Sequence, residues 1–332
     1  MAVLGVDGGG RKTHAAVADI DGTLLGFAQA GPSNWEIVGL DAALGAIAEA
    51  SDRALEGAGL GRDGIDSAVF GLAGLDWPAD EVQMQEALDV LGFGGHRRLV
   101  NDAFVALRAG CIQPWGVVVI AGTGTIAAGR DPAGNEYRTL GLGRVYGDFG
   151  SEFDVSELAV RAVADSFVGR GPSTMLTELL CARAGEATAE GLLERISRAD
   201  TRLRSPEVAN MAPLVLQATE AGDLVARQIL EEIGQALGAT VGHVATRLGM
   251  EDLEFTVVLA GGLFRTPNRY LLDQLELGVR RTAPNASLSI LSAPPVAGSV
   301  LMALELAGPE IRAGLAPRLA ADVSRAMKES TP

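Results

Sequence analysis

Three consecutive glycines follow an aspartate near the start of the chain, in the stretch VLGVDGGGRKT at residues 3–13. Glycine loses more backbone entropy on folding than any other residue, so such a run is costly unless the backbone needs that freedom. Two needs fit here: a tight turn between strands, or a close approach of the backbone to a ligand. The second would place backbone N–H groups and hydroxyls around an anion such as a phosphate.

A second glycine loop, IAGTGT at residues 120–125, also follows an apolar run. Neither loop has the GxxxxGK[ST] pattern of a P-loop. The residues after the second loop, TIAAGRDPAGNEY, favour a strand and a hairpin rather than the helix that a dinucleotide-binding turn requires. Each loop alone could be a simple tight turn. As a pair at matching positions of a repeat, they predict two β-hairpin tips that bind phosphate.

An aspartate with the right setting for proton transfer occurs in VNDAF, residues 100–104. A short strand is expected to end at Asn101 and Asp102, with a helix beginning directly afterwards. Phosphoryl transfer needs a group that orients the acceptor hydroxyl and takes its proton, and Asp102 is the candidate. As an alternative, Asp102 caps the following helix, a role that Asn101 could fill instead.

The composition is that of a globular protein of 332 residues, long enough for two domains. A formal net charge of −15 argues against nucleic acid or an anionic membrane as a partner. Cys111 and Cys181 form no CxxC motif and no disulfide framework. No signal peptide or membrane-spanning run is recognised, so we expect a cytoplasmic protein.

The elements that must position these residues occur in the same order twice. The first copy predicts strands at 2–7, 13–20, 23–30, 65–74 and 97–101, with helices at 40–59, 80–91 and 103–110. The second copy predicts strands within 116–129 and at 136–143, 255–264 and 287–294, with helices at 154–168, within 174–220, and at 224–248, 268–281 and 296–307. The pattern β-β-β-α-β-α-β-α is therefore duplicated, with extra helices in the second copy.

This duplication predicts an α/β protein of two similar lobes that face each other across a central cleft. We expect an N-terminal lobe at 1–113 and a C-terminal lobe at 114–332, with inserted helices at about 170–220. Ligands of open α/β sheets bind at the carboxyl ends of the strands. Both glycine loops and the Asn101–Asp102 pair follow such strand ends, so we expect them to line the cleft.

Taken in order, these motifs resemble the sugar-kinase, actin and Hsp70 ATPase superfamily, in its branch of N-acetylglucosamine kinases and BadF/BadG/BcrA/BcrD-type ATPases. The matching segments are GVDGGGRKT, GPSNW, GLAG, VNDAF, IAGTGT, GDFGS, VVLAGGLF and PPVAGSVLMAL, which run the whole length of the chain. The resemblance implies an actin-like ATPase fold with two duplicated ribonuclease H-like lobes. It also implies an ATP-dependent kinase that phosphorylates a sugar hydroxyl, and a homodimer.

The resemblance assigns roles to residues of these motifs. Asp102 would be the catalytic base, and Asp7 would hold Mg²⁺ through water, although Asp7 could instead be an Asx-turn residue. The residues implied in ATP phosphate binding are Gly8, Gly9, Gly10, Arg11, Lys12, Thr13, Gly122, Thr123, Gly124 and Thr125. Those implied in adenosine binding are Gly261 and Gly262, and those implied in acceptor binding are Ser33, Asn34, Asp102, Gly124 and Asp148.

For three of these assignments, a purely structural role is an alternative. The pair Gly261 and Gly262 could form a simple helix-entry turn. Asn34 could be a left-handed turn residue, and Asp148 could lie in a solvated turn. Arg11 stands where the family usually has Thr, so it assists phosphate binding or points to solvent.

Several acceptor-side residues depart from the family pattern. Ile126 replaces an Asn, Leu142 replaces a Trp, and Phe149 and Asp154 break the pattern GDEGSxYW. The expected acceptor is therefore an amino sugar such as N-acetylglucosamine or glucosamine, phosphorylated at the 6-hydroxyl, without one sugar being singled out. Two other functions stay open: an ATPase that activates a partner enzyme through an iron–sulfur cluster, and a non-catalytic sensor of sugar or nucleotide.

Overall fold

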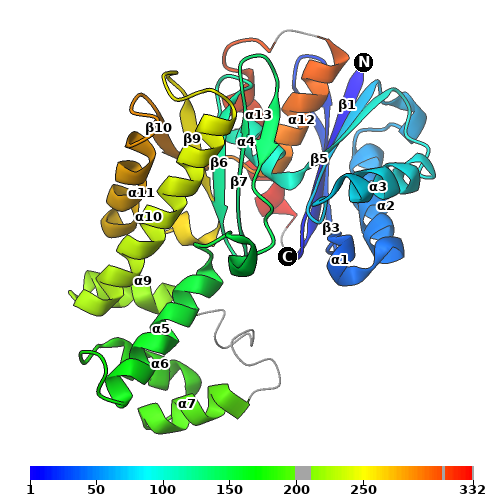
Figure 1. Ribbon diagram of the computed structural model, residues 1–332. Helices are drawn as coiled ribbons and strands as arrows, with labels where there is room; N and C mark the ends of the chain where they lie inside the picture. Colours follow the sequence, from blue (N-terminus) through cyan, green and yellow to red (C-terminus); the bar gives the residue numbers. More distant parts are fainter. Residues whose placement is uncertain (199–210, 309–310, 331–332) are drawn as a thin grey trace. The chain divides into compact units, whose positions relative to one another are not determined.

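Figure 1 presents a computed structural model of the chain, which describes residues 1–198, 211–308 and 311–330. The contacts divide the chain into two compact units. The first unit comprises Met1–Val118, Pro132–Gly134 and Ser289–Pro332, and the second comprises Val119–Asp131 and Asn135–Leu288. Within the described residues, no helix is both long enough and apolar enough to cross a membrane.

The first unit is built on a five-stranded sheet with the strand order β3-β2-β1-β4-β5. Its strands are β1 (Ala2–Gly8), β2 (Thr13–Asp19), β3 (Leu24–Ala30), β4 (Ser67–Leu72) and β5 (His96–Asn101). The strands β1, β2 and β3 form an antiparallel meander, whereas β4 is parallel to β1 and β5 is parallel to β4. The carboxyl ends of β1, β4 and β5 therefore meet at one edge of the sheet.

Helices cover both faces of this sheet (Figure 1). They are α1 (Trp35–Val38), α2 (Leu40–Gly57), α3 (Pro78–Asp89), α4 (Asp102–Gly110), α12 (Pro295–Ala307) and α13 (Leu315–Glu329), with a 3-10 turn at Arg62–Gly64. Successive strand side chains point to opposite faces. Leu4 and Val6 of β1 accordingly join the core formed with α2 and α3, whereas Gly5 lies against Val300 of α12.

The second sheet has the strand order β10-β9-β6-β7-β8 and lies mainly in the second unit. Its strands are β6 (Gly116–Ala121), β7 (Thr125–Arg130), β8 (Glu136–Arg138), β9 (Thr256–Ala260) and β10 (Ser287–Ile290). Numbered by their order in each copy, both sheets run third, second, first, fourth and fifth strand. The identical order confirms the duplication that the sequence predicts.

Further helices follow in the second unit. They are α5 (Glu152–Phe167), α6 (Leu176–Ala184), α7 (Ala189–Arg198), α9 (Ala212–Glu220), α10 (Leu224–Arg247) and α11 (Arg269–Arg280), with 3-10 turns at Arg144–Tyr146 and Gly262–Phe264. Part of the segment 174–220, for which several helices are predicted, lies outside the described residues at 199–210.

Several elements differ from the sequence prediction. The short helix α1 is not expected, and β4 and β10 are shorter than the strands expected at 65–74 and 287–294. A strand is expected over 136–143, but β8 ends at Arg138, and Gly141 and Gly143 beyond it have φ angles of 74° and 89° that no regular strand contains. The helix α13 is not expected, because its buried side is a narrow stripe of Leu315, Leu319 and Val323.

The last part of the chain packs with the first unit rather than with its neighbours in sequence. The hydroxyl of Ser299 on α12 donates to the Val6 carbonyl of β1 at 2.8 Å, and Ser67 Oγ of β4 donates to the Ala303 carbonyl of α12 at 2.6 Å. Sequence order had grouped this segment with the C-terminal lobe, because hydrogen bonds between residues more than 200 positions apart leave no local pattern.

Candidate active site

Asp7 and Asp102 lie at the carboxyl edge of the first sheet. Gly8 of β1 is paired with Leu72 of β4, and Leu72 is paired with Asn101 of β5. Asp7 precedes this row by one residue and Asp102 follows it by one. Neighbouring strands lie about 4.8 Å apart, so one intervening strand separates the backbones of the two aspartates by roughly 10 Å.

The carboxyl group of Asp7 is held in an environment that disfavours its charge. Burial, and to a lesser extent the nearby Asp102 carboxylate, raise the pKa of Asp7 to about 7, although the charge of Lys12 partly opposes them. The side chain keeps 20% of its surface exposed. Asp7 lies within β1, so the Asx-turn alternative is wrong. A partly accessible carboxyl group beside a second one is a place where a cation would be favoured.

His14 lies opposite Asp7 on β2, and none of the sequence motifs singles it out. Its Nδ1 is 3.9 Å from Asp7 Oδ2, and its Nε2 is 3.0 Å from Gln29 Oε1. Burial lowers the pKa of His14 to about 4, so the ring is neutral at pH 7. The sequence could indicate the proximity of His14 to Asp7 only through the pairing of the two strands in the hairpin.

The first glycine turn presents its tip to solvent and ties its end to the next loop. Gly9 N–H donates to the Lys12 carbonyl at 3.1 Å, and Gly10, Arg11 and Lys12 are exposed. Thr13 is buried instead, and its hydroxyl donates to the Gly31 carbonyl at 2.7 Å. Thr13 therefore anchors the turn in this structure rather than lining its tip.

The predicted acceptor loop is bound to the glycine turn. Its Ser33 is buried, with Oγ 2.8 Å from the Thr13 hydroxyl, and the Gly9 carbonyl accepts the backbone N–H groups of Ser33 and Asn34 at 3.0 and 3.3 Å. Asn34 has a φ of −73°, so the left-handed turn alternative is wrong. Its Oδ1 accepts the Glu36 N–H at 3.1 Å and thereby caps α1.

Asp102 is not the cap of α4. Asn101 takes that role, because its Oδ1 accepts the Ala103 N–H at 3.1 Å and its Nδ2 donates to the Leu75 carbonyl at 3.4 Å. Asp102 is the first residue of α4 and is partly exposed. The N-cap of α4 is therefore Asn101, and the alternative in which Asp102 caps this helix is wrong.

The second glycine loop forms the hairpin tip between β6 and β7 in the second unit. Gly122 N–H donates to the Gly124 carbonyl at 3.0 Å, and Thr123 and Gly124 are exposed. Thr125 is only 3% exposed, and its hydroxyl has no hydrogen-bond partner among the described residues. An unsatisfied buried hydroxyl costs about 1 to 3 kcal/mol. This orphaned group fits a site that binds a phosphate.

The turn after β9 contacts the same hairpin. Gly261 has a φ of +103°, and a side chain on it would overlap the backbone of Ala121. A side chain on Gly262 would overlap the carboxylate of Glu152, whose own N–H donates to the Gly122 carbonyl at 2.8 Å. Both predicted nucleotide segments of the second unit therefore meet at the start of α5. Sequence reasoning missed Glu152, which directly follows the GDFGS motif.

Asp148, predicted to contact the acceptor, is a buried residue of the loop before α5. It is 5% exposed, and its Oδ2 accepts the Leu142 N–H at 3.0 Å, so the solvated-turn alternative is wrong. Leu142, one of the departures from the family pattern, thus donates its backbone N–H to the carboxylate of Asp148. The loop between them is closed by the bond from Tyr146 N–H to the Gly143 carbonyl at 2.9 Å.

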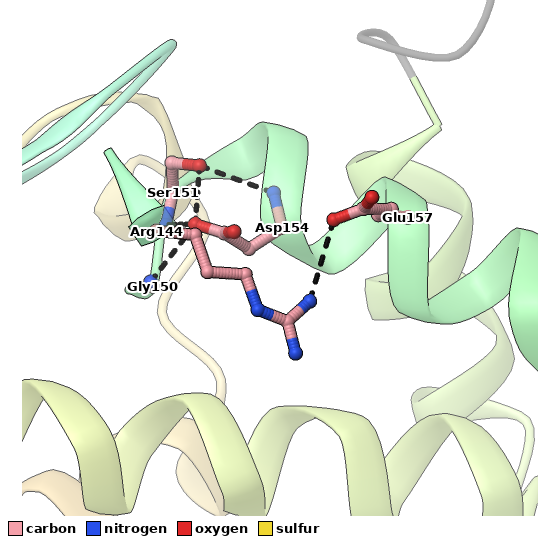
Figure 2. Close-up of polar contacts among 5 residues, drawn as sticks. All are labelled: Arg144, Gly150, Ser151, Asp154 and Glu157. Carbon is pink, nitrogen blue, oxygen red and sulfur yellow. Dashed lines mark hydrogen bonds and ion pairs between the residues drawn. The ribbon is translucent and has the colours of Figure 1, made fainter. Parts of the chain in front are cut away.

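Asp154, another departure, completes the capping box of α5, whose N-cap is Ser151. Its Oδ2 accepts Gly150 N–H, Ser151 N–H and Ser151 Oγ–H at 3.0, 2.9 and 2.6 Å, and Ser151 Oγ accepts the Asp154 N–H at 3.1 Å (Figure 2). This reciprocal capping box fixes the start of the helix. The Arg144 guanidinium also donates to Glu157 Oε2 at 3.4 Å, a contact drawn as a dashed line in Figure 2. The Arg144 guanidinium lies 4.8 Å from the ring centre of Phe149.

A comparison with protein-family models identifies the family. The model described as the BadF/BadG/BcrA/BcrD ATPase family matches residues 4–303. The chain belongs to this family. The family predicted from the eight sequence motifs is thereby confirmed.

Two characterised proteins are similar to this BadF/BadG/BcrA/BcrD family member over nearly its whole length. One is the N-acetylmuramic acid/N-acetylglucosamine kinase of Clostridium acetobutylicum, 30% identical over 91% of this chain and 97% of its own length. The other is the N-acetyl-D-glucosamine kinase of Dictyostelium discoideum, also 30% identical, with the same coverage of both chains. These similarities confirm the predicted class of enzyme, an ATP-dependent sugar kinase.

Solved structures confirm the fold of this family member. A Chromobacterium violaceum protein provisionally named an N-acetylglucosamine kinase superposes with a TM-score of 0.68 at 25% identity, covering 91% of this chain and 98% of that protein. A ROK family glucokinase from Streptomyces griseus superposes with a TM-score of 0.52 at 18% identity, covering 91% and 98%. The two-lobed α/β fold of actin-like sugar kinases is thus confirmed, whereas the homodimer and the cytoplasmic location stay predictions.

Proposed function

We propose that this protein transfers the γ-phosphate of ATP to a hydroxyl, the 6-hydroxyl, of an amino sugar such as N-acetylglucosamine or a close relative of it. The observation that carries the proposal is the carboxyl edge of the first sheet. There Asp102 is relieved of helix capping by Asn101 and lies near Asp7, on the edge to which the acceptor loop is hydrogen-bonded. Both similar kinases named above act on amino sugars by their names.

Asp102 orients the acceptor hydroxyl and takes its proton late in the transfer. A late proton transfer suits a carboxylate, because the phosphoryl group departs through a loose transition state. The amide of Asn34 has its oxygen engaged in capping α1, which leaves the NH₂ group to donate to an acceptor hydroxyl. Ser33, Gly124 and Asp148 are the further residues assigned to the acceptor.

Each unit offers its own turn to the phosphates. In the first unit, Gly8, Gly9 and Gly10 form the turn. The Gly9 N–H is engaged by the Lys12 carbonyl, so the exposed tip supplies the Gly10 N–H together with the positive charges of Arg11 and Lys12. In the second unit, the orphaned hydroxyl of Thr125 and the backbone of residues 122–124 do so. Gly261 and Gly262 lie against the nucleoside.

Asp7 is the residue that would hold Mg²⁺, through water. Mg²⁺ is commonly bound by one or two carboxylates together with substrate phosphates and waters, and it neutralises developing charge on the transferred group. No group of three or more His, Cys, Asp or Glu residues in the described part of the chain is arranged to hold a metal ion. The raised pKa of Asp7 fits a carboxyl group that ionises fully only when a cation is beside it.

A coupled assay of ADP release with Mg·ATP tests the proposal. The acceptors are N-acetylglucosamine, glucosamine, N-acetylmuramic acid, N-acetylmannosamine and glucose, and the phosphorylated position is read from the product by NMR. We expect one of the amino sugars to stimulate ADP release well above glucose and to carry phosphate on its 6-hydroxyl. ATP turnover that no sugar stimulates would contradict the proposal and favour an ATPase that serves a partner enzyme.

A further inference from the structure

The side chain of Glu152 occupies the point where the two predicted nucleotide segments of the second unit meet. Its carboxylate lies against the α-carbon of Gly262, in the space that a side chain there would fill. Its backbone N–H donates to the Gly122 carbonyl at 2.8 Å, which fixes the start of α5 on the hairpin tip. Any nucleoside that rests on Gly262 therefore has the carboxylate of Glu152 as a neighbour.

Glu152 has no evident structural task for its carboxylate. The start of α5 is already capped by Ser151 and Asp154, whose side chains bond each other's backbone N–H groups. Within residues 1–198, 211–308 and 311–330, the Glu152 carboxylate accepts no hydrogen bond and forms no ion pair. Its favourable interaction with the helix dipole is worth only about 0.3 to 1 kcal/mol.

The chemistry of a carboxylate restricts what it can bind here. An ionised carboxylate only accepts hydrogen bonds, and it repels phosphate oxygens. Adenosine carries donors at the ribose hydroxyls and at the N6 amino group of adenine, and the ribose hydroxyls are the donors nearer to the phosphates. Acidic side chains bind the ribose diol in dinucleotide-binding folds for the same reason.

We propose that Glu152 binds the ribose hydroxyls of ATP and makes the site selective for ribonucleotides. This inference rests on the proposed nucleotide site of the second unit. Because Gly262 lacks a side chain, the carboxylate can lie directly beside the nucleoside. Glu152 is thereby a specificity-determining residue, distinct from the turns that bind the phosphates.

The test compares the affinities of ATP, 2′-deoxy-ATP and 3′-deoxy-ATP for the full chain by isothermal titration calorimetry with Mg²⁺ and no sugar. Hydrogen bonds to charged groups predict that the wild-type protein binds ATP about 10-fold or more tightly than at least one deoxy analogue. In Glu152→Ala this preference should vanish, with the affinity for the deoxy analogue nearly unchanged. Glu152→Gln, which keeps the shape and removes the charge, should show a reduced preference.

Glu157→Ala is the matched control, because Glu157 lies on the same helix and contacts Arg144 rather than the glycine turns. It should keep the wild-type preference. The same preference in Glu152→Ala as in the wild-type protein, or no preference in the wild-type protein, would overturn the inference while leaving the proposed kinase intact. A wild-type protein that binds none of the three nucleotides would overturn the proposed function itself.

Discussion

At the scale of single residues, the fold disfavours the ionised form of the Asp7 carboxyl group. Asp7 has a folded-state pKa of about 7 against an ordinary value near 3.8, so the folded protein prefers its protonated form. The stability that goes with protonation is present at low pH and is lost as the pH rises from about 4 to about 7. Burial of the Asp7 carboxylate thus lowers stability at the position proposed to hold Mg²⁺.

Asp7→Asn removes this pH dependence. Between pH 5 and pH 8, we expect the free energy of unfolding of the variant to rise relative to the wild-type protein by about 2 to 3 kcal/mol, measured by urea denaturation without Mg²⁺ or nucleotide. His14, whose pKa is lowered to about 4, titrates below the window in the folded state of both proteins. A difference between the two proteins that stays the same at both pH values would contradict the account of Asp7.

The role of a single residue could be predicted from the sequence only where its residue type and its immediate neighbours along the chain indicate that role. The strand end, the glycines and the following Asp102 indicate a phosphoryl-transfer site, and Asn101 is a ready helix cap. His14 and Glu152 were missed. His14 reaches Asp7 only through strand pairing, and Glu152 reaches Gly262 across more than 100 residues of sequence, so neither leaves a local pattern.

At the scale of elements, α12 packs closely against both β1, the central strand of the first sheet, and α4. Gly298 lies against the Val105 carbonyl of α4, so a side chain there would overlap backbone that cannot easily move. We expect Gly298→Ala to lower the free energy of unfolding by about 2 kcal/mol, because overpacking outweighs the better helix propensity of Ala.

Gly45→Ala is the matched control in the same unit. A side chain on Gly45 of α2 would meet nothing within 4 Å, so the substitution should raise the free energy of unfolding by about 0.5 to 1 kcal/mol. Urea denaturation of both variants measures whether each substitution raises or lowers the free energy of unfolding. Stabilisation by both substitutions would show that α12 and α4 do not approach each other as the structure has them.

The elements themselves were largely predictable, because hydrophobic periodicity and Asp-Gly or glycine turns mark them along the chain. The exceptions have physical reasons. The strand expected over 136–143 is cut short by two glycines with positive φ, whose conformation the sequence does not state. The grouping of α12 with β1 depends on contacts between distant parts of the chain.

At the scale of the whole molecule, two copies of one sheet order account for the paired glycine turns, one after the first strand of each copy. The two cysteines, by contrast, do not occupy matching positions in the two copies. Cys111 and Cys181 are 4% and 7% exposed, and burial raises the pKa of the Cys111 thiol to about 12. A thiol of this kind stays protonated, and only the thiolate is a metal ligand.

Replacement of both cysteines by serine therefore separates the kinase from a partner-activating ATPase. We expect the double variant to keep sugar-dependent ADP release within about twofold of the wild-type rate at 25 °C, and the purified wild-type protein to show no visible absorption from iron. Activity that disappears together with an iron chromophore would instead support the ATPase that serves a partner.

The central claim is that Asp102 takes the proton of the acceptor hydroxyl. Its most direct test is the rate of sugar phosphate formation by Asp102→Asn, followed by phosphorus NMR at saturating ATP and sugar. Asp89→Asn, which changes a carboxylate paired with Arg97 in the same unit, is the control. General base catalysis predicts a fall in kcat of about 100-fold or more for Asp102→Asn, with nucleotide binding retained and Asp89→Asn unaffected. A kcat for Asp102→Asn within a fewfold of the wild-type value would contradict the account.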